Sequence, residues 1–216
     1  VRKANSGHPG GAMSSADFIY LLFKDYLKFN PKDHSWFDRD RFILSGGHMS
    51  MLQYGILHML GWMKLSDIKK FRQLGSQTPG HPEVEIKGVE CTTGPLGQGF
   101  AMGVGMAFAE AYLSEITKLD EEGTKLVDHY TYVLATDGDL QEPVALGAAA
   151  IAGHLGLKKL VVYYDANDAQ ISGKVSRSDS VDYATVFDGL GWNVQTIDGH
   201  DHSAMHFAIE TAKVMD

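Results

Sequence analysis

The sequence predicts an α/β protein in which helices cover both faces of a parallel sheet. From residue 129 onward, short apolar segments of strand length alternate with segments of helical periodicity. The strand candidates are almost entirely apolar, which is typical of parallel strands buried under helices on both sides. The chain has 216 residues, 44% of them hydrophobic and 21% charged, so it is long enough to bury a core without disulfides.

The first half of the chain is expected to hold helices around one short strand. Ala12 to Phe29 has apolar residues at helical spacing, and Asn30-Pro31 ends this helix. Residues 39–45 form a strand candidate, whereas residues 75–93 are rich in Gly, Pro and Thr and are expected to form a loop. Ser66 is a plausible cap for a short helix. Further helices are expected at residues 49–61, 66–74 and 97–116.

The second half alternates regularly between strands and helices. Strands are expected at residues 130–135, 159–164 and 192–197. Helices are expected at residues 144–155, 181–190 and 202–214. Crossovers between parallel strands are right-handed, and ligands of such sheets bind beyond the carboxyl ends of the strands. The chain shows no internal repeat, low-complexity stretch or domain linker.

Charge and composition argue against several classes of function. The formal net charge of -8 disfavours general binding to nucleic acid or to an anionic membrane surface. No run of 18 apolar residues is present, and the first residues do not form a signal peptide. The single cysteine, Cys91, excludes an internal disulfide and fits a reducing compartment, so a cytoplasmic location is predicted. An acidic protein must bind a phosphorylated ligand locally, through a metal ion, backbone N–H groups and a few basic side chains.

Two polar residues follow successive strands of the alternating half. Asp137 stands in the turn Thr136-Asp137-Gly138 after the strand at 130–135, and Asn167 follows the next strand, 167 − 137 = 30 residues later. Neighbouring parallel strands end at the same sheet edge, about 4.8 Å apart. A carboxylate and an amide oxygen at this edge suit Mg²⁺ or Ca²⁺ with open positions for phosphate oxygens, and Gly138 lets a phosphate approach the backbone. Asp and Asn are also common turn formers, so the pair alone leaves both interpretations open.

Three histidines lie in loops flanked by glycine: His8, His48 and His81. Loop residues held by tight turns carry function more often than core residues do. One such histidine is usually structural, but three in similar settings indicate a shared polar site. His200 and His202 lack further ligands at zinc spacing and are predicted to lie at a solvated helix start.

Residues 94–99 open the predicted helix at 97–116 but form only a weak nucleotide fingerprint. They do not follow a convincing strand, and the G-x-G-x-x-G pattern is not satisfied. The chain also lacks a G-x-x-x-x-G-K-[ST] loop and a G-x-S-x-G elbow. These absences argue against the commonest nucleotide-binding and hydrolase functions.

Several stretches carry a shared pattern: residues 4–10, 36–42, 47–48, 71–73, 78–83, 92–99 and 197–201. In family order and across essentially the whole chain, they resemble the transketolase family of thiamine-diphosphate enzymes. Related enzymes such as dihydroxyacetone synthase share much of this pattern and remain close alternatives. The resemblance implies a thiamine-diphosphate-binding fold, with the parallel sheet flanked by helices that composition and periodicity already predict.

The resemblance also implies roles for individual residues. His8 and His81 match histidines that line the reaction centre and hold substrate hydroxyls, which makes them the catalytic candidates. Positions that match ligands of the metal, Mg²⁺ or Ca²⁺, are Asp137, Asn167 and the backbone carbonyl of Ala169. Positions that match other contacts with thiamine diphosphate are His48, Gly94, Leu96 and Gly138, with Asn167 shared between metal and cofactor.

The activity implied by the resemblance is transfer of a two-carbon ketol unit between sugar phosphates, as in the pentose phosphate pathway. Residues 1–216 are then expected to be an incomplete diphosphate-binding domain, without the pyrimidine-binding and C-terminal domains. In the family the site lies between two subunits, so a homodimer or a pairing with a pyrimidine-domain subunit is expected. The glutamate that activates the cofactor lies in the following domain, and this chain alone is expected to be inactive.

Three positions depart from the family pattern. Thr136 replaces a glycine, which is tolerable if its backbone has negative φ, and Pro143 stands where glycine is usual. Gly147 replaces a glutamate that, with Glu142, belongs to an acid network connecting the two active sites of the family dimer. These departures leave open a non-catalytic homologue that retains the cofactor. An unrelated Mg²⁺-dependent phosphate-binding α/β protein is also possible on the residues alone.

Overall fold

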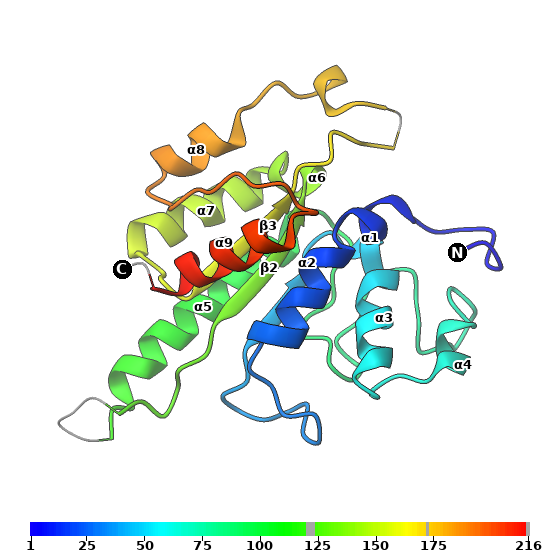
Figure 1. Ribbon diagram of the computed structural model, residues 1–216, viewed down its shortest axis with the longest axis horizontal. Helices are drawn as coiled ribbons and strands as arrows, with labels where there is room; N and C mark the ends of the chain where they lie inside the picture. Colours follow the sequence, from blue (N-terminus) through cyan, green and yellow to red (C-terminus); the bar gives the residue numbers. More distant parts are fainter. Residues whose placement is uncertain (120–123, 172, 215–216) are drawn as a thin grey trace.

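Three parallel strands form the central sheet of the computed structural model (Figure 1). The strands β1 (Arg41–Leu44), β2 (Thr131–Thr136) and β3 (Leu160–Asp165) lie in the order β1-β2-β3, with β2 in the middle. Thr136, the last residue of β2, pairs with Asp165, the last residue of β3. The strands that precede Asp137 and Asn167 are therefore neighbours, the condition under which the two residues lie close at one edge. The structure describes residues 1–119, 124–171 and 173–214.

The predicted helix over residues 12–29 is divided into three pieces: α1 (Gly10–Ser14), α2 (Ala16–Leu21) and the π-helical segment η1 (Leu22–Tyr26). The break falls at Ser15. Its hydroxyl donates to the Asp165 carboxylate at 3.1 Å, and the neighbouring Ser14 hydroxyl donates to the same oxygen at 2.5 Å. These bonds tie the break to the end of β3, a tertiary contact that helical periodicity does not contain.

The segment after β1 follows the prediction except that the helix expected at residues 66–74 is much shorter, with turns over residues 69–72. A 3₁₀ turn, η2 (Gly47–Met49), leads into α3 (Ser50–Met59), and α4 (Leu65–Ile68) follows. Ser66 lies inside α4 and is not its cap, because Lys64 occupies that position. Residues 75–93, all of them described, contain neither helix nor strand, so the predicted loop is confirmed.

The second half agrees with the prediction except at one strand. Residues 192–197, all described, form no strand, because their backbone makes no ladder bonds to a neighbouring strand in the described part of the chain. Residues 193–196 are exposed, and only the ends of the segment, Trp192 and Ile197, pack against the hydrophobic core. The helices of this part and the long one before it are α5 (Gln98–Ile116), α6 (Asp137–Leu140), α7 (Pro143–Leu155), the 3₁₀ turn η3 (Val175–Arg177), α8 (Tyr183–Gly189) and α9 (His202–Val214).

The sheet separates two hydrophobic layers, as predicted for helices on both faces. Strand residues such as Ile43 and Val133 pack with α5, α7 and α8, whereas Phe42 and Leu134 face α2 and α9. Alternate strand residues point to opposite faces, so each strand contributes to both layers. Gly103 of α5 packs closely on β2, as the helix glycines predicted, because a Cβ atom there would lie 2.4 Å from Val133 Cγ2.

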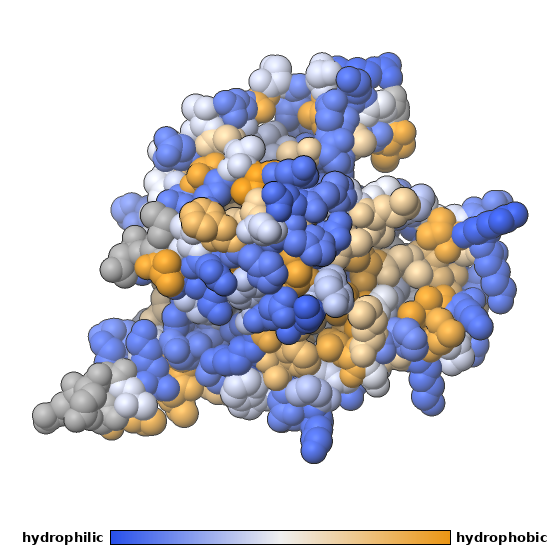
Figure 2. Space-filling model, in the orientation of Figure 1, coloured by the Kyte–Doolittle hydropathy of each residue, from blue (hydrophilic) through white to orange (hydrophobic). Residues whose placement is uncertain are grey.

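The surface shown in Figure 2 is mixed. Apolar residues gather over the region of α1 and α3, where Met13 is 74% and Met59 67% exposed. Across the described residues, each helix is too short or too polar to cross a membrane.

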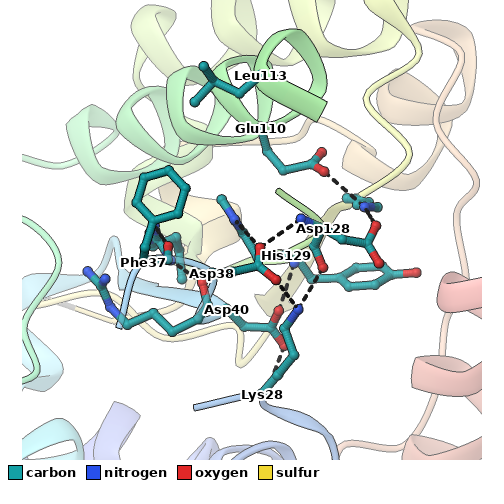
Figure 3. Close-up of polar contacts among 12 residues, drawn as sticks. Lys28, Phe37, Asp38, Asp40, Glu110, Leu113, Asp128 and His129 are labelled. Carbon is teal, nitrogen blue, oxygen red and sulfur yellow. Dashed lines mark hydrogen bonds and ion pairs between the residues drawn. The ribbon is translucent and has the colours of Figure 1, made fainter. Parts of the chain in front are cut away.

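A polar network closes the sheet edge at the amino ends of the strands (Figure 3). Asp38 accepts hydrogen bonds from the Asp128 backbone N–H at 2.7 Å and the Lys28 ammonium at 2.7 Å, and it contacts His129 Nδ1 at 3.3 Å. Asp40 accepts from the backbone N–H groups of Lys28 and Tyr130, both at 2.8 Å. Because ligands of parallel sheets bind at the opposite edge, this network serves the fold.

Burial of His129 makes the folded state sensitive to acid. Burial, reinforced by the charge of Arg41, lowers the pKa of His129 from 6.5 to about 4, although Asp38 opposes the shift. The folded protein therefore holds this ring neutral in a range where the unfolded chain protonates it. Since the unfolded state then binds more protons, stability is lost as the pH falls from 6.5 towards about 4.

We expect His129→Gln to flatten the pH dependence of the free energy of unfolding in this window. Because glutamine does not titrate, the variant should lose about 2 kcal/mol less stability than the parent between about pH 7 and pH 4. Urea denaturation followed by circular dichroism at several pH values measures both slopes. Two parallel curves, offset but equally steep, would contradict the role of His129.

Candidate functional site

A buried carboxylate, Asp139, holds the chain segments of the candidate site together at the carboxyl edge of the sheet. Its hydrogen bonds with Ser45, Gly97 and Thr136 are called the Asp139 frame below. Its Oδ1 accepts hydrogen bonds from the Ser45 hydroxyl at 2.7 Å and the Gly97 N–H at 2.8 Å. Its Oδ2 accepts from the backbone N–H and the hydroxyl of Thr136, both at 2.9 Å. The end of β1, the end of β2 and the start of α5 are thereby held against one side chain with no exposed surface.

Asp137 lies beside this frame and is only partly paired. It begins α6 immediately after β2, is 4% exposed, and its Oδ1 accepts a hydrogen bond from the Tyr164 hydroxyl of β3. Its Oδ2 is buried and has no hydrogen-bond partner in the part of the chain that the structure describes. An unpaired buried carboxylate oxygen costs free energy unless a cation or a donor meets it. Burial also raises the pKa of Asp137, against the opposing bond from Tyr164. The side chain therefore fits a metal ligand.

Asn167 lies just beyond β3, at the same edge. Its amide Nδ2 donates to Asp165 Oδ2 at 3.0 Å, and its Oδ1 accepts from the Ala169 N–H at 2.9 Å. Between them, Asp168 adopts a φ of 54°, which makes the segment a tight turn. The paired ends of β2 and β3 thus bring Asp137, Asn167 and Ala169 to one edge, as predicted. A second lone pair on the Asn167 oxygen remains suited to a hard cation.

The three loop histidines predicted to share a polar site do come together. The rings of His8 and His48 have centroids 5.3 Å apart in an edge-to-face arrangement. The pKa of His48 is lowered by burial and then by His8, with a smaller effect from His81. The pKa of His81 is lowered by burial, then by Arg72 and His8. These effects favour neutral imidazoles at His48 and His81.

The loop at residues 94–97 connects the histidines to the Asp137 turn. A Cβ atom at Gly94, whose φ is 146°, would lie 3.2 Å from the His81 ring, and one at Gly47 would lie 2.7 Å from the Gly94 nitrogen. At the other end, a Cβ at Gly138 would lie 2.8 Å from Leu96 Cδ1. Close backbone approach therefore places the predicted cofactor contacts side by side. These are His48, Gly94, Leu96 and Gly138.

The three departures from the family pattern are accommodated. Thr136 has a φ of −124°, so the condition for replacing glycine is met, and its hydroxyl joins the Asp139 frame. Pro143 is the first residue of α7, a position where its missing N–H costs nothing. Gly147 is exposed, and a Cβ atom there would meet nothing within 4 Å among the described residues.

Sequence reasoning missed the residues that support the site. Asp139 takes part in a capping box with Thr136, and the Thr-x-x-Asp spacing was the available signal. Tyr164 and Asp165 end β3, and only the folded structure reveals their hydrogen bonds with Asp137 and Asn167. His200 and His202 both contact the exposed Asp17, and the described residues contain no group of three or more potential metal ligands among His, Cys, Asp and Glu.

An unpaired buried carboxylate, a polar turn on the neighbouring strand and glycine loops lie at one sheet edge, so the class of protein is an α/β domain with a candidate ligand site at the carboxyl ends of its strands. A family model described as "Transketolase, thiamine diphosphate binding domain" matches residues 1–216. The chain belongs to the transketolase family and is its thiamine-diphosphate-binding domain. This membership excludes an unrelated phosphate-binding protein. Relatives named transketolase favour neither dihydroxyacetone synthase nor a non-catalytic homologue.

Individual relatives agree with this membership. The transketolase of Staphylococcus aureus (strain MW2) is 51% identical over 215 residues, covering 99% of this chain and 32% of that protein. The transketolase of Nostoc sp. (strain PCC 7120) is 48% identical over all of this chain and 32% of its own. The structure of transketolase from Leishmania mexicana matches with a TM-score of 0.96 and 43% identity, over 100% of this chain and 32% of that one. The chain thus spans about a third of the length of these relatives.

We expect Asp139→Asn to destabilise the protein by roughly 2–4 kcal/mol, because an amide NH₂ would face N–H and O–H donors that now bond to a carboxylate oxygen. Asp188→Asn, at an exposed position on α8, is the matched control and should change stability by less than about 0.5 kcal/mol. Urea denaturation at neutral pH measures both variants. Equal small effects would show that the frame does not depend on Asp139.

Proposed function

We propose that this chain supplies the diphosphate-binding half of a transketolase site, in which a two-carbon ketol unit passes between sugar phosphates. The observation that carries the proposal is the buried, unpaired Oδ2 of Asp137 at the strand edge of a thiamine-diphosphate-binding domain. Such an oxygen is best satisfied by the cation that accompanies a diphosphate. Mg²⁺ or Ca²⁺ has the required preference for carboxylate, amide and carbonyl oxygens.

Each predicted residue has a role that its position supports. Asp137, the Asn167 side chain and the Ala169 carbonyl hold the metal, and Gly138 and His48 contact the diphosphate. Gly94 and Leu96 lie where the loop passes between His81 and the Asp137 turn, which suits contact with the cofactor rings. When bound, the cofactor supplies the nucleophilic carbon and the electron sink for cleavage between C2 and C3 of a ketose.

His8 and His81 are the proposed catalytic residues. Both side chains lie on exposed loops beside His48, open to a substrate that approaches the edge of the sheet. The lowered pKa of His81 keeps its imidazole neutral near pH 7, so that it can accept a proton from a substrate hydroxyl. Together the two rings hold hydroxyls of the sugar phosphate and move a proton as the C2–C3 bond breaks.

The proposed site is completed by a second subunit. Residues 1–216 form an incomplete diphosphate-binding domain, and the pyrimidine-binding and C-terminal domains belong to other parts of the enzyme. A side of α5 supports this pairing, because apolar side chains at helical spacing are half exposed on it: Phe108 (51%), Tyr112 (59%) and Ile116 (59%). Either the second copy in a homodimer or a separate pyrimidine-domain subunit would cover this apolar surface.

The proposed setting is the pentose phosphate pathway in the cytoplasm. The single cysteine, Cys91, is a free and buried thiol, and burial raises its pKa to about 11. Such a thiol is unreactive and suits a protein that works in a reducing compartment.

We expect Asp137→Ala to abolish Mg²⁺-dependent binding of thiamine diphosphate to the full-length enzyme. The variant removes the only carboxylate among the proposed metal ligands, so a loss of at least about 100-fold in affinity is expected. Calorimetric titration with and without Mg²⁺ measures it, and Asp188→Ala on α8 is the matched control. Unchanged affinity in Asp137→Ala would refute the site.

We also expect residues 1–216 alone to show no ketol transfer, because the group that activates the cofactor ring lies in the pyrimidine-binding domain. The assay supplies xylulose 5-phosphate and ribose 5-phosphate with thiamine diphosphate and Mg²⁺. Activity should be present when the pyrimidine-binding domain is included. Turnover by the 216-residue chain alone would contradict the divided site.

A further inference from the structure

Arg72 stands between the two loops that carry the proposed catalytic histidines. Its backbone has a φ of 59°, in the left-handed region that a side chain other than glycine rarely adopts. Its N–H donates to the Thr78 carbonyl at 2.9 Å, which closes the tight loop that leads to His81. Such a conformation costs of order 1 kcal/mol or more for arginine, and glycine would avoid this cost. The presence of arginine where glycine would be less strained indicates a use for its side chain.

The side chain of Arg72 bridges the two loops. Its Nη1 donates to the Ser6 hydroxyl at 2.6 Å, two residues before His8. On the other side, the guanidinium packs on Gly80, the residue before His81, so closely that a Cβ atom there would lie 2.9 Å from Arg72 Nε. One planar group therefore touches the neighbours of both histidines.

Phe71 packs against Arg72 and against the His8 loop. Arg72 Cζ lies 5.5 Å from the centroid of the buried Phe71 ring, and a Cβ atom at Gly7 would lie 3.0 Å from Phe71 Cε1. The Phe71-Arg72 pair thus contacts the His8 loop at both Ser6 and Gly7. Neither loop can shift far without breaking a contact with this pair.

Arg72 is not explained as a structural ion pair. The described residues contain no acidic group in a salt bridge with it, and its buried Nε has no hydrogen-bond partner among them. Arg39 provides the contrast, because its Nε and Nη2 bond to both oxygens of Glu90 at 2.9 and 2.6 Å. The charge of Arg72 instead acts on His81, whose pKa is lowered first by burial and then by Arg72.

We propose that Arg72 is a positioning residue for the ketol transfer proposed above, holding the His8 and His81 loops at a fixed separation through Ser6 and Gly80. It acts through the two histidines and not on the reacting atoms. The proposal rests on the proposed function for its kinetic consequence, whereas the bridge itself is a property of this chain.

Three variants and one control test the bridge. Arg72→Met keeps an unbranched chain over Phe71 but removes the charge and the donors, and Arg72→Lys keeps the charge without the planar fork. Ser6→Ala removes the acceptor on an exposed loop and leaves the fold intact. Arg39→Met removes a partly buried arginine that contacts neither histidine loop.

NMR titration of the His81 ring in each variant gives a result that does not depend on activity. In Arg72→Met the titration midpoint of His81 should rise by about 0.5 pH unit or more, because a nearby cation is lost. His8 and His48 are the other titrating groups facing His81, and their rings are followed in the same spectra. In Arg72→Lys and Arg39→Met the midpoint should stay within about 0.2 unit of the parent. An unchanged midpoint in Arg72→Met would overturn the proposal.

Kinetics of the full-length enzyme test the consequence for catalysis. Arg72→Met should lower kcat about 10-fold with less than a twofold change in the Kd of thiamine diphosphate, and Ser6→Ala should lower kcat by a smaller factor. The double variant should be no slower than Arg72→Met, because both changes break one bridge. Multiplicative losses, or a rise in KM confined to phosphorylated sugars, would overturn the proposal, and the latter would indicate direct contact with a phosphate. Failure of the parent enzyme to transfer ketol units would refute the proposed function, and the His81 titration would still decide the bridge.

Discussion

The arrangement of the site depends on the four hydrogen bonds accepted by Asp139. A carboxylate inside a protein is stable only if donors replace the water it has lost, and here those donors come from the ends of β1 and β2 and from the start of α5. Ser45 extends the frame, since its hydroxyl also accepts the Phe100 N–H at 2.9 Å. The loops that carry His48 and Gly94 begin from these fixed points.

Two carboxylates in the same short helix, Asp137 and Asp139, differ in how completely they are hydrogen-bonded. Asp139 has both oxygens satisfied and holds chain segments together, whereas the neighbouring Asp137 keeps one buried oxygen without a partner among the described residues. The same desolvation that makes Asp139 a strong internal anchor leaves Asp137 in need of a cation. The Tyr164 hydroxyl of β3 donates to Asp137 and so connects this proposed metal ligand to the neighbouring strand. The metal proposed above would supply the partner that Asp137 Oδ2 lacks among the described residues.

Much of the fold was predictable from local pattern, and the failures share a cause. The strands, the long helix α5 and the loop at 75–93 follow from periodicity and composition. The break at Ser15 follows from hydrogen bonds to Asp165, which lies 150 residues away in the chain. The segment at 192–197 has the alternation of a strand, but a strand exists only where a neighbouring backbone supplies ladder bonds. At Ser15 a contact with a residue distant in sequence interrupts the helix that local periodicity predicts. At residues 192–197 the strand that local alternation predicts does not form, because a pairing strand is missing among the described residues.

By itself, the sequence determined the fold class, the family and the positions of the chemistry-bearing residues, because strand ends, glycine turns and loop histidines are encoded locally. Only the tertiary structure decided which of those residues work together. The pairing of β2 with β3 brought Asp137 beside Tyr164, and the loop packing gathered His8, His48 and His81 and placed Arg72 between two of their loops. The turns at Asp137 and Asn167 can be recognised from the sequence. Asp137 Oδ2 becomes a buried oxygen without a partner among the described residues only when folding removes the water around it.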